Sequence, residues 1–275
     1  TTPYYEVDGL AGITAGDVVG VPVTFILTVQ PTPTVSSTVT GPDGSVTMSS
    51  STTSYTMTIC SGETVSTNPP VSASANPSSC GVLRIKAEYS TTISSISPQT
   101  QTADYLYSAA SVLPVQTISP QNNDGVAKDI TFITTPYYEV DGLAGITAGD
   151  VVGVPVTFVL TVQPTPVVSS TVTGPDGSIT MSSRTTPYTM TICSGETVTT
   201  SDPTSTSVDP SSCGPLWANV TSTTDISTLP QTSTYDVPMV QTSPASTFIS
   251  PENHDGIAKN ITFVSTPYYD VDGSH

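Results

Sequence analysis

The sequence predicts an all-β protein made of tandem antiparallel β-sandwiches. Its apolar residues alternate with polar ones at a period of two, in short runs rich in Val, Thr and Ile. Gly, Pro and Asn-Asp-Gly turn signals separate these runs at intervals of about 8–12 residues. No stretch of about 10–12 residues has a helical period with caps. The chain also repeats itself, which indicates more than one unit of the same kind.

The repeat has a unit of about 130 residues. The opening segment Thr1–Pro33 returns at Thr134–Pro166, where Val159 replaces Ile26. The same segment begins a third time at Ser265, as STPYYDVDG. Between these copies, GPDGS and YTMTICSGETV also recur, and NNDGVAKDITF at Asn122–Phe132 matches NHDGIAKNITF at Asn253–Phe263. Repetition of this kind produces length and surface rather than one active site.

The first element that we expect is a strand at Val21–Gln30, VPVTFILTVQ. Its period of two places one set of apolar side chains on a single face, which we predict to be the core face. These residues are Val21, Val23, Phe25, Leu27 and Val29. The segment PTPT at Pro31–Thr34 should end the strand, because proline has no N–H to donate to a sheet; it indicates an interdomain hinge or a strand exchange.

Four further elements follow in the first copy. Pro-Asp-Gly within Thr38–Met48 predicts a hairpin. In Val82–Ser90 we expect Leu83 or Arg84 to face inward, and in each Tyr-Tyr pair we expect one ring in the core and one outside. The predicted elements are the hairpin, Ser54–Cys60, Val82–Ser90 with its counterpart Pro215–Ser222, and Val126–Val140.

Composition excludes several classes of partner. The formal net charge is −17, with five Lys and Arg residues in total. Such a surface repels phosphate backbones and anionic lipids, so we expect no nucleic-acid binding and no binding to a membrane surface. No apolar run approaches the roughly 20 residues of a membrane helix, so we expect no membrane insertion. The absence of a signal peptide indicates a mature or excised segment.

Four cysteines allow three disulfide pairings. Repeat symmetry favours one disulfide within each copy, Cys60–Cys80 and Cys193–Cys213. The alternative is metal ligation, but the chain has no CxxC motif and only two histidines. Disulfides require an oxidising compartment, so we expect the protein to be extracellular or on the cell surface.

Acidic residues recur beside glycines in both copies. Alternating carboxylates there could supply oxygen ligands for calcium at a junction between domains. The alternative, which we favour, is turn formation, because Asp-Gly suits positions where φ is positive; it also applies to Asn122 and Asp124 and to their counterparts Asn253 and Asp255. We expect no other cofactor. The calcium candidates are Glu6, Asp8, Asp17, Glu139, Asp141 and Asp150.

Asn219-Val-Thr and Asn260-Ile-Thr match the acceptor pattern for N-glycosylation. O-linked sugar on the Ser- and Thr-rich segments is a separate possibility. The sequence contains no GxSxG, HExxH, phosphate-loop or dinucleotide-binding motif. We therefore expect that the protein is not an enzyme.

The segments ICSGETV, TPYYEVDG and VTFxLTVQPTP resemble the PKD-like, immunoglobulin-like repeats of large secreted and surface proteins of gliding, type IX-secreting bacteria. In that family a unit opens near a CSGxT segment, carries a Trp-containing strand and ends in TxTVxPTP. Two features depart from it: Trp217 occupies the Trp position of the second copy but Arg84 that of the first, and DGLAG lacks a cysteine. The resemblance implies an Ig-like fold and a structural or adhesive extracellular module without catalytic residues.

The family's limits divide the chain into three parts: terminal strands at 1–33, a complete Ig-like domain at 34–166, and a second domain at 167–275 that lacks its last strands. Residues 1–30 correspond to that missing piece. Either further repeats follow in one polypeptide, or copies join head to tail with 1–30 completing a neighbour. Both alternatives predict an extracellular filament or stalk. The rival hypothesis is a cell-surface adhesin that binds carbohydrate or protein.

Overall fold

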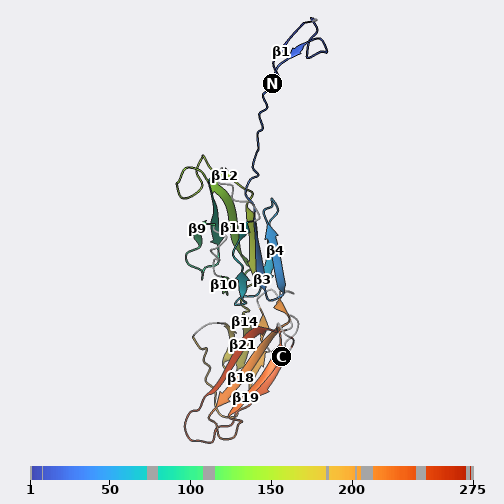
Figure 1. Cartoon of the computed structure of the whole chain (residues 1–275). Helices are drawn as coiled ribbons and strands as arrows, with labels where there is room; N and C mark the ends of the chain where they lie inside the picture. The colour runs from blue at the N-terminus through green and yellow to red at the C-terminus, as the bar shows by residue number, and fades with distance from the viewer. Residues whose placement is uncertain are drawn as a thin grey trace. The chain divides into compact units, whose positions relative to one another are not determined.

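The computed structural model describes residues 2–7, 9–72, 80–107, 115–183, 186–201, 203–205, 213–239, 246–270 and 273. These residues form an almost entirely β protein, with no α-helix among them (Figure 1). The chain divides into two compact units, Thr1–Pro31 and Thr32–His275. The predicted all-β class is therefore confirmed.

The N-terminal unit contains one small antiparallel ribbon. Strand β1 (Tyr4–Tyr5) pairs with β2 (Val18–Val19), and Tyr4 lies opposite Val19. Residues 20–34 belong to no strand. The predicted strand at Val21–Gln30 is thus wrong for this copy of the sequence, because no second strand pairs with it.

The larger unit begins with a five-stranded sheet. The Pro-Asp-Gly hairpin is confirmed: Gly41 pairs with Gly44, which has a φ of 134° that favours glycine. The order is β10-β6-β3-β4, and β7 also pairs with β3. The strands are β3 (Val35–Gly41), β4 (Gly44–Ser49), β6 (Val65–Thr67), β7 (Val71–Ser72) and β10 (Gln116–Ile118).

A six-stranded sheet follows, in the order β5-β13-β11-β8-β9, with β12 also pairing with β11. Strand β13 lies between two neighbours, antiparallel to β11 and parallel to β5, so that Phe158 is opposite both Phe132 and Tyr55. The strands are β5 (Tyr55–Ile59), β8 (Val82–Thr91), β9 (Thr100–Leu106), β11 (Lys128–Glu139), β12 (Val151–Val152) and β13 (Val156–Val162).

These two sheets enclose one apolar core and form the first sandwich. Strand β13 alternates strictly between buried and half-buried positions, as a strand with one core face should. Its Phe158 ring lies 6.1 Å from that of Phe132, centroid to centroid. The buried side chains that β13 contributes to this core are Val156, Phe158, Leu160 and Val162.

The second sandwich is built the same way but is less complete. One sheet has the order β15-β14-β16-β20, with β17 on β14; the other is β19-β18-β21. Its buried core cluster is Val168, Leu216, Ala218 and Met239, with Tyr269 packed against it. The strands are β14 (Val168–Gly174), β15 (Gly177–Ser182), β16 (Val198–Ser201), β17 (Thr204–Ser205), β18 (Leu216–Thr224), β19 (Thr232–Pro238), β20 (Ser246–Ile249) and β21 (Ile261–Tyr269).

The two sandwiches differ at the position of β13. Residues Tyr188–Ile192 have the sequence YTMTI, identical to β5, yet they form no strand. In the first sandwich, β5 pairs with β13 and with no other strand. The second sandwich has no counterpart of β13 among its described residues, so the segment equivalent to β5 lacks the strand with which β5 pairs.

We predict that Leu160→Ala lowers the free energy of unfolding of the first sandwich by about 2–5 kcal/mol, because it leaves a cavity in a closed core. The matched control is Leu27→Ala, in the other copy of the same segment. Its effect on the unassembled chain should stay within about 0.5 kcal/mol. Urea unfolding followed by circular dichroism on dilute protein measures both. Equal losses in the two variants would contradict this account of β13.

Candidate functional site

One strand sequence occurs in two environments. Residues 23–29 (VTFILTV) differ from β13 (VTFVLTV) only at Ile26. The core-facing residues of β13 are at most 3% exposed. Their counterparts are 69% exposed at Val23, 85% at Phe25, 73% at Leu27 and 80% at Val29. An apolar segment that forms a core in one copy is therefore exposed to solvent in the other, together with Val21 at 85%.

The second sandwich has an open edge where that strand would fit. Strand β21 pairs with β18 along one edge, and no strand of the described part of the chain pairs with its other edge. In β11 the equivalent edge, Lys128–Thr134, pairs with β13 over its whole length. Beside this unpaired edge of β21, the residue Phe263 is 45% exposed and Val264 is 53% exposed. An unpaired edge beside exposed apolar residues favours the addition of a strand.

The Cys-Ser-Gly-Glu turn beside this edge has the same geometry in both sandwiches. The Cys60 N–H donates to Glu63 Oε2 at 2.7 Å, and the Cys193 N–H donates to Glu196 Oε2 at 2.6 Å. The glycine of the turn has a φ of 86° in the first copy and 81° in the second. The second turn therefore holds its shape without a strand equivalent to β13.

Asn122, in the loop before β11, is hydrogen-bonded to the end of β13. It is fully buried, and its Nδ2 donates to the carbonyl oxygens of Val126 and Val162, both at 2.8 Å. Its counterpart Asn253 donates from Nδ2 to Ile257 at 2.8 Å. The position equivalent to Val162 is Val29, which belongs to the exposed segment.

The same asparagines shape turns, as expected. The Asp124 N–H donates to Asn122 Oδ1 at 3.1 Å, and the Asp255 N–H donates to Asn253 Oδ1 at 3.0 Å. Hydrogen bonds from the hydroxyl and backbone N–H of Ser94 lower the pKa of Asp124. Those from Ser227 lower the pKa of Asp255 in the same way.

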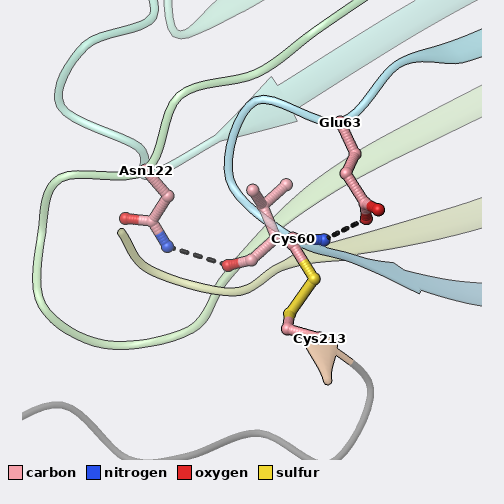
Figure 2. The surroundings of a disulfide bond; sticks show 5 residues. Cys60, Glu63, Asn122 and Cys213 are labelled. Atoms are coloured by element: carbon pink, nitrogen blue, oxygen red, sulfur yellow. Dashed lines mark hydrogen bonds between the residues drawn. A yellow bond between two sulfur atoms is a disulfide. The ribbon is translucent and has the colours of Figure 1, made fainter. Parts of the chain in front are cut away.

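The disulfide joins Cys60 to Cys213, with a Cα–Cα distance of 5.7 Å (Figure 2). It links the first sandwich to the second. The pairing favoured by repeat symmetry within each copy, Cys60–Cys80 and Cys193–Cys213, is therefore wrong. Cys80 and Cys193 are not part of this bond, and Cys193 is exposed.

Sheet register explains why Cys60 and Cys80 do not pair. Cys60 follows β5, whose last residue is aligned through β13 with the start of β11 at Lys128. Cys80 precedes β8, whose first residue lies opposite Glu139 at the end of β11. Twelve strand residues span roughly 36 Å, whereas a disulfide needs Cα atoms within about 7 Å. In the first sandwich, Cys60 and Cys80 therefore lie near opposite ends of the sheet that contains β11. Cys193 and Cys213 hold the equivalent positions in the sequence of the second sandwich.

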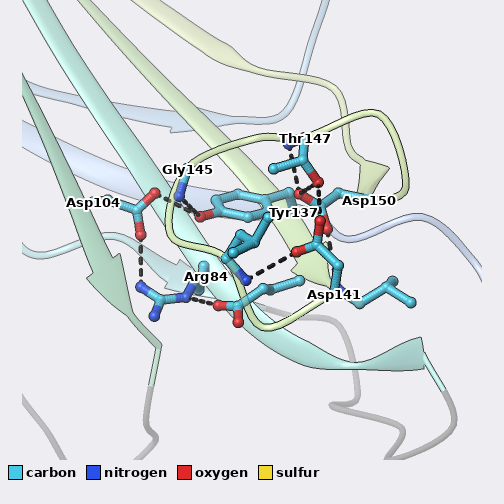
Figure 3. A network of polar contacts seen from close by, with 10 residues as sticks. Arg84, Asp104, Tyr137, Asp141, Gly145, Thr147 and Asp150 are labelled. Carbon is cyan, nitrogen blue, oxygen red and sulfur yellow. Dashed lines mark hydrogen bonds and ion pairs between the residues drawn. The ribbon is translucent and has the colours of Figure 1, made fainter.

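A polar network covers the C-terminal end of β11, opposite the end that lies near Cys60 (Figure 3). Arg84 forms ion pairs with Asp104, at 2.8 Å, and with Glu139. The Tyr137 hydroxyl donates to Asp104 Oδ2 at 2.5 Å and accepts from the Gly145 N–H at 3.2 Å. Hydrogen bonds to the two carboxylates raise the pKa of Arg84. Burial, followed by the hydrogen bond to Asp104, raises the pKa of Tyr137 to about 12.

Both tyrosines of the middle pair are buried, with Tyr137 0% and Tyr138 1% exposed. The expectation that one ring faces outward is wrong here, because the loop after β11 covers Tyr137. In the second sandwich, Trp217 takes the place of Arg84, and the Tyr268 hydroxyl donates to Asp236 at 3.2 Å.

Two of the calcium candidates, Asp150 and Asp17, serve as hydrogen-bond acceptors in loops. Asp150 accepts from the N–H groups of Thr147 at 2.7 Å and Val140 at 3.0 Å, and these bonds lower its pKa. Asp17 is held in the same way by Thr14 and Val7, with the same effect on its pKa.

The other candidates are placed as follows. Asp141 accepts from the Thr147 hydroxyl at 2.8 Å, Glu139 binds Arg84, and Glu6 is exposed. Asp8 lies outside the described residues. Among the residues that are described, no three His, Cys, Asp or Glu side chains form a group suited to a metal. Calcium binding stays a prediction.

The two glycosylation candidates lie at different levels of exposure. Asn260 is exposed beside β21, whereas Asn219 is half-buried in β18 and donates to Asp236 at 3.0 Å. Asn260 takes the position of Asp129, whose carboxylate accepts from Thr161 of β13 at 2.7 Å. Asn260 therefore borders the open edge, and glycosylation stays a prediction at both sites.

Comparison with protein-family models, with curated proteins and with solved structures found no match for this chain. Over the described ranges, no helix has the length and apolar character to cross a membrane. The exposed segment, the open edge of β21 and the cysteines are therefore the features that bear on function.

We predict that Tyr137→Phe changes how stability depends on alkaline pH. A pKa raised from 10 to about 12 on folding contributes stability that is complete below pH 10 and is lost as the pH rises to 12. The wild-type free energy of unfolding should fall between pH 10 and 12 by about 2–3 kcal/mol more than that of the variant. Urea unfolding at a series of pH values tests this, and parallel curves would contradict it.

Proposed function

We propose that this protein is an extracellular structural protein whose copies assemble end to end into a filament. Residues 21–30 of one copy, here called the donor strand, complete the second sandwich of its neighbour. The observation that carries the proposal is the contrast within one chain. The sequence of β13 is buried in the first sandwich, whereas its near-identical copy is exposed and the second sandwich lacks that strand.

The register of β13 gives the expected register of the donor strand. By equivalence with the first sandwich, Phe25 would lie opposite Phe263 on one side and Tyr188 on the other. Val29 would lie opposite Lys259 and Ile192, and its carbonyl would accept from Asn253 Nδ2 as that of Val162 does from Asn122. The segment Tyr188–Ile192 would then become a strand, as β5 is.

Burial of the donor strand contributes favourable free energy to assembly. Covering Val23, Phe25, Leu27 and Val29 contributes about 1.5–3 kcal/mol per side chain, or roughly 6–12 kcal/mol together. Hydrogen bonds along both edges of the inserted strand add to this. Ordering of the exposed segment and loss of translational and rotational freedom oppose it.

The proposed contact joins two different surfaces, the donor strand of one copy and the open edge of β21 in another. A heterologous contact of this kind leaves one unused donor and one unused edge after every addition, so growth continues into a filament. The same junction would connect successive repeats within a longer polypeptide. Tandem Ig-like domains in the filament are part of the proposal and agree with the two β-sandwiches and the repeat.

The chemistry of the chain supports an extracellular location. The Cys60–Cys213 disulfide is of a kind that forms and persists in oxidising compartments. The net charge of −17 keeps polymers apart from one another in solution. Adhesion to carbohydrate or protein is the rival function, and filament formation does not require it.

We predict that Leu27→Asp abolishes filaments, because it places a charge in the core that the donor strand would enter. Thr28→Asp is the matched control, since the equivalent Thr161 is half-buried on the other face of β13. The control should assemble within about threefold of the wild-type critical concentration. Sedimentation velocity and negative-stain electron microscopy across a concentration series measure both.

A peptide of residues 21–30 should also bind the wild-type chain and cap growing filaments, whereas the same peptide with Leu27→Asp should not. Filaments that form equally well from the Leu27→Asp chain would overturn the proposal. Glycan binding by monomers that never assemble would favour the adhesin instead.

A further inference from the structure

The chain contains one complete junction between sandwiches, and that junction includes a disulfide. We propose that Cys193 of one copy forms an intermolecular disulfide with Cys80 of the next copy, so that the filament is covalently linked along its length. This inference rests on the proposed donor-strand assembly. It is suggested by the equivalence of Cys193 to Cys60 and of Cys80 to Cys213 in the repeat.

Strand insertion decides which cysteines meet. In the observed junction, the first sandwich receives β13 and contributes Cys60, from the turn that follows β5. The sandwich that continues from β13 contributes Cys213, from the segment before β18. At the proposed junction, the second sandwich receives the donor strand and presents Cys193. The first sandwich of the next copy continues from that strand and presents Cys80.

The connection between strand and sandwich is the same at both junctions. Gln163–Pro166 reads QPTP between β13 and β14, and Gln30–Pro33 reads QPTP between the donor strand and β3. In the observed junction, the Thr165 N–H donates to the carbonyl of Asn122 at 2.8 Å. Thr32 and Asn253 are the equivalent pair. A linker that shares these four residues, with Thr34 in place of Val167 after them, should bring the second pair of cysteines to a similar separation.

Cys193 is already positioned for this bond. The hydrogen bond from its N–H to Glu196 matches that of Cys60 to Glu63, and Gly195 donates to Pro251 at 2.9 Å as Gly62 does to Pro120 at 2.8 Å. The difference is exposure: Cys60, in its disulfide, is 4% exposed, whereas Cys193 is exposed. The turn thus presents an accessible thiol where the first sandwich has a buried disulfide.

The bond forms by thiol–disulfide exchange with a small external disulfide such as oxidised glutathione. The Cys193 thiolate attacks this disulfide, gives a mixed disulfide and releases one glutathione thiolate. The Cys80 thiolate of the next copy then displaces the second glutathione. Two protein thiols lose two protons and two electrons in total, and one oxidised glutathione becomes two reduced molecules.

The test begins with filaments assembled in oxidised glutathione, alkylated, and boiled in detergent without reductant. We expect a ladder of covalent oligomers that collapses to monomer when reductant is added. Cys193→Ser and Cys80→Ser chains should still form filaments but yield only monomer after boiling. Mass spectrometry of the unreduced digest should contain one cross-linked pair, the Cys193 peptide joined to the Cys80 peptide.

The outcomes separate this inference from the proposed function. Wild-type filaments that boil to monomer without reductant would overturn the disulfide and leave donor-strand assembly standing. A cross-link between two Cys193 peptides would also overturn it, since insertion of the donor strand pairs unlike cysteines. If neither the wild-type chain nor the serine variants form filaments, the assembly itself fails. The Leu27→Asp chain should give no ladder, because the cysteines meet only after insertion.

Discussion

The insertion of β13 between β11 and β5 is the contact on which the first sandwich depends. Parallel pairing with β5 requires a strand that arrives from a distant part of the chain, and β13 follows β5 by about a hundred residues. Four of its side chains enter the core, and β5 has no other sheet partner. In the second sandwich, whose described residues include no equivalent of β13, the identical YTMTI segment is not a strand and the buried cluster is smaller.

The chain therefore contains an internal comparison of the closed and open forms of one module. Two turns are the same in both forms: the Cys-Ser-Gly-Glu turns share their hydrogen bonds, and the segments NNDG at 122–125 and NHDG at 253–256 form the same turn. What differs is the strand edge beside β21 and the burial of the residues that face it. Because these turns are already organised in the open form, they lose little further entropy when a strand is added.

Several carboxylates of this protein organise its loops and strand ends. Asp150 and Asp17 each accept two backbone N–H groups, and Glu139 and Asp104 neutralise Arg84 above the buried Tyr137. This arrangement gives acidic residues a structural role in both units.

The sequence by itself determined the β class, the repeat, the Pro-Asp-Gly hairpins and the approximate limits of strands such as β8 and β11, because alternation and turn chemistry are local properties. It also indicated which face of VTFILTV requires burial. Only the tertiary structure decided that one copy of this segment is a buried strand and the other is exposed, that Cys60 pairs with Cys213, and that both Tyr137 and Tyr138 are buried. A local sequence pattern indicates that a side chain should be buried. Which segment covers it depends on how distant strands and the ends of their sheets are brought together.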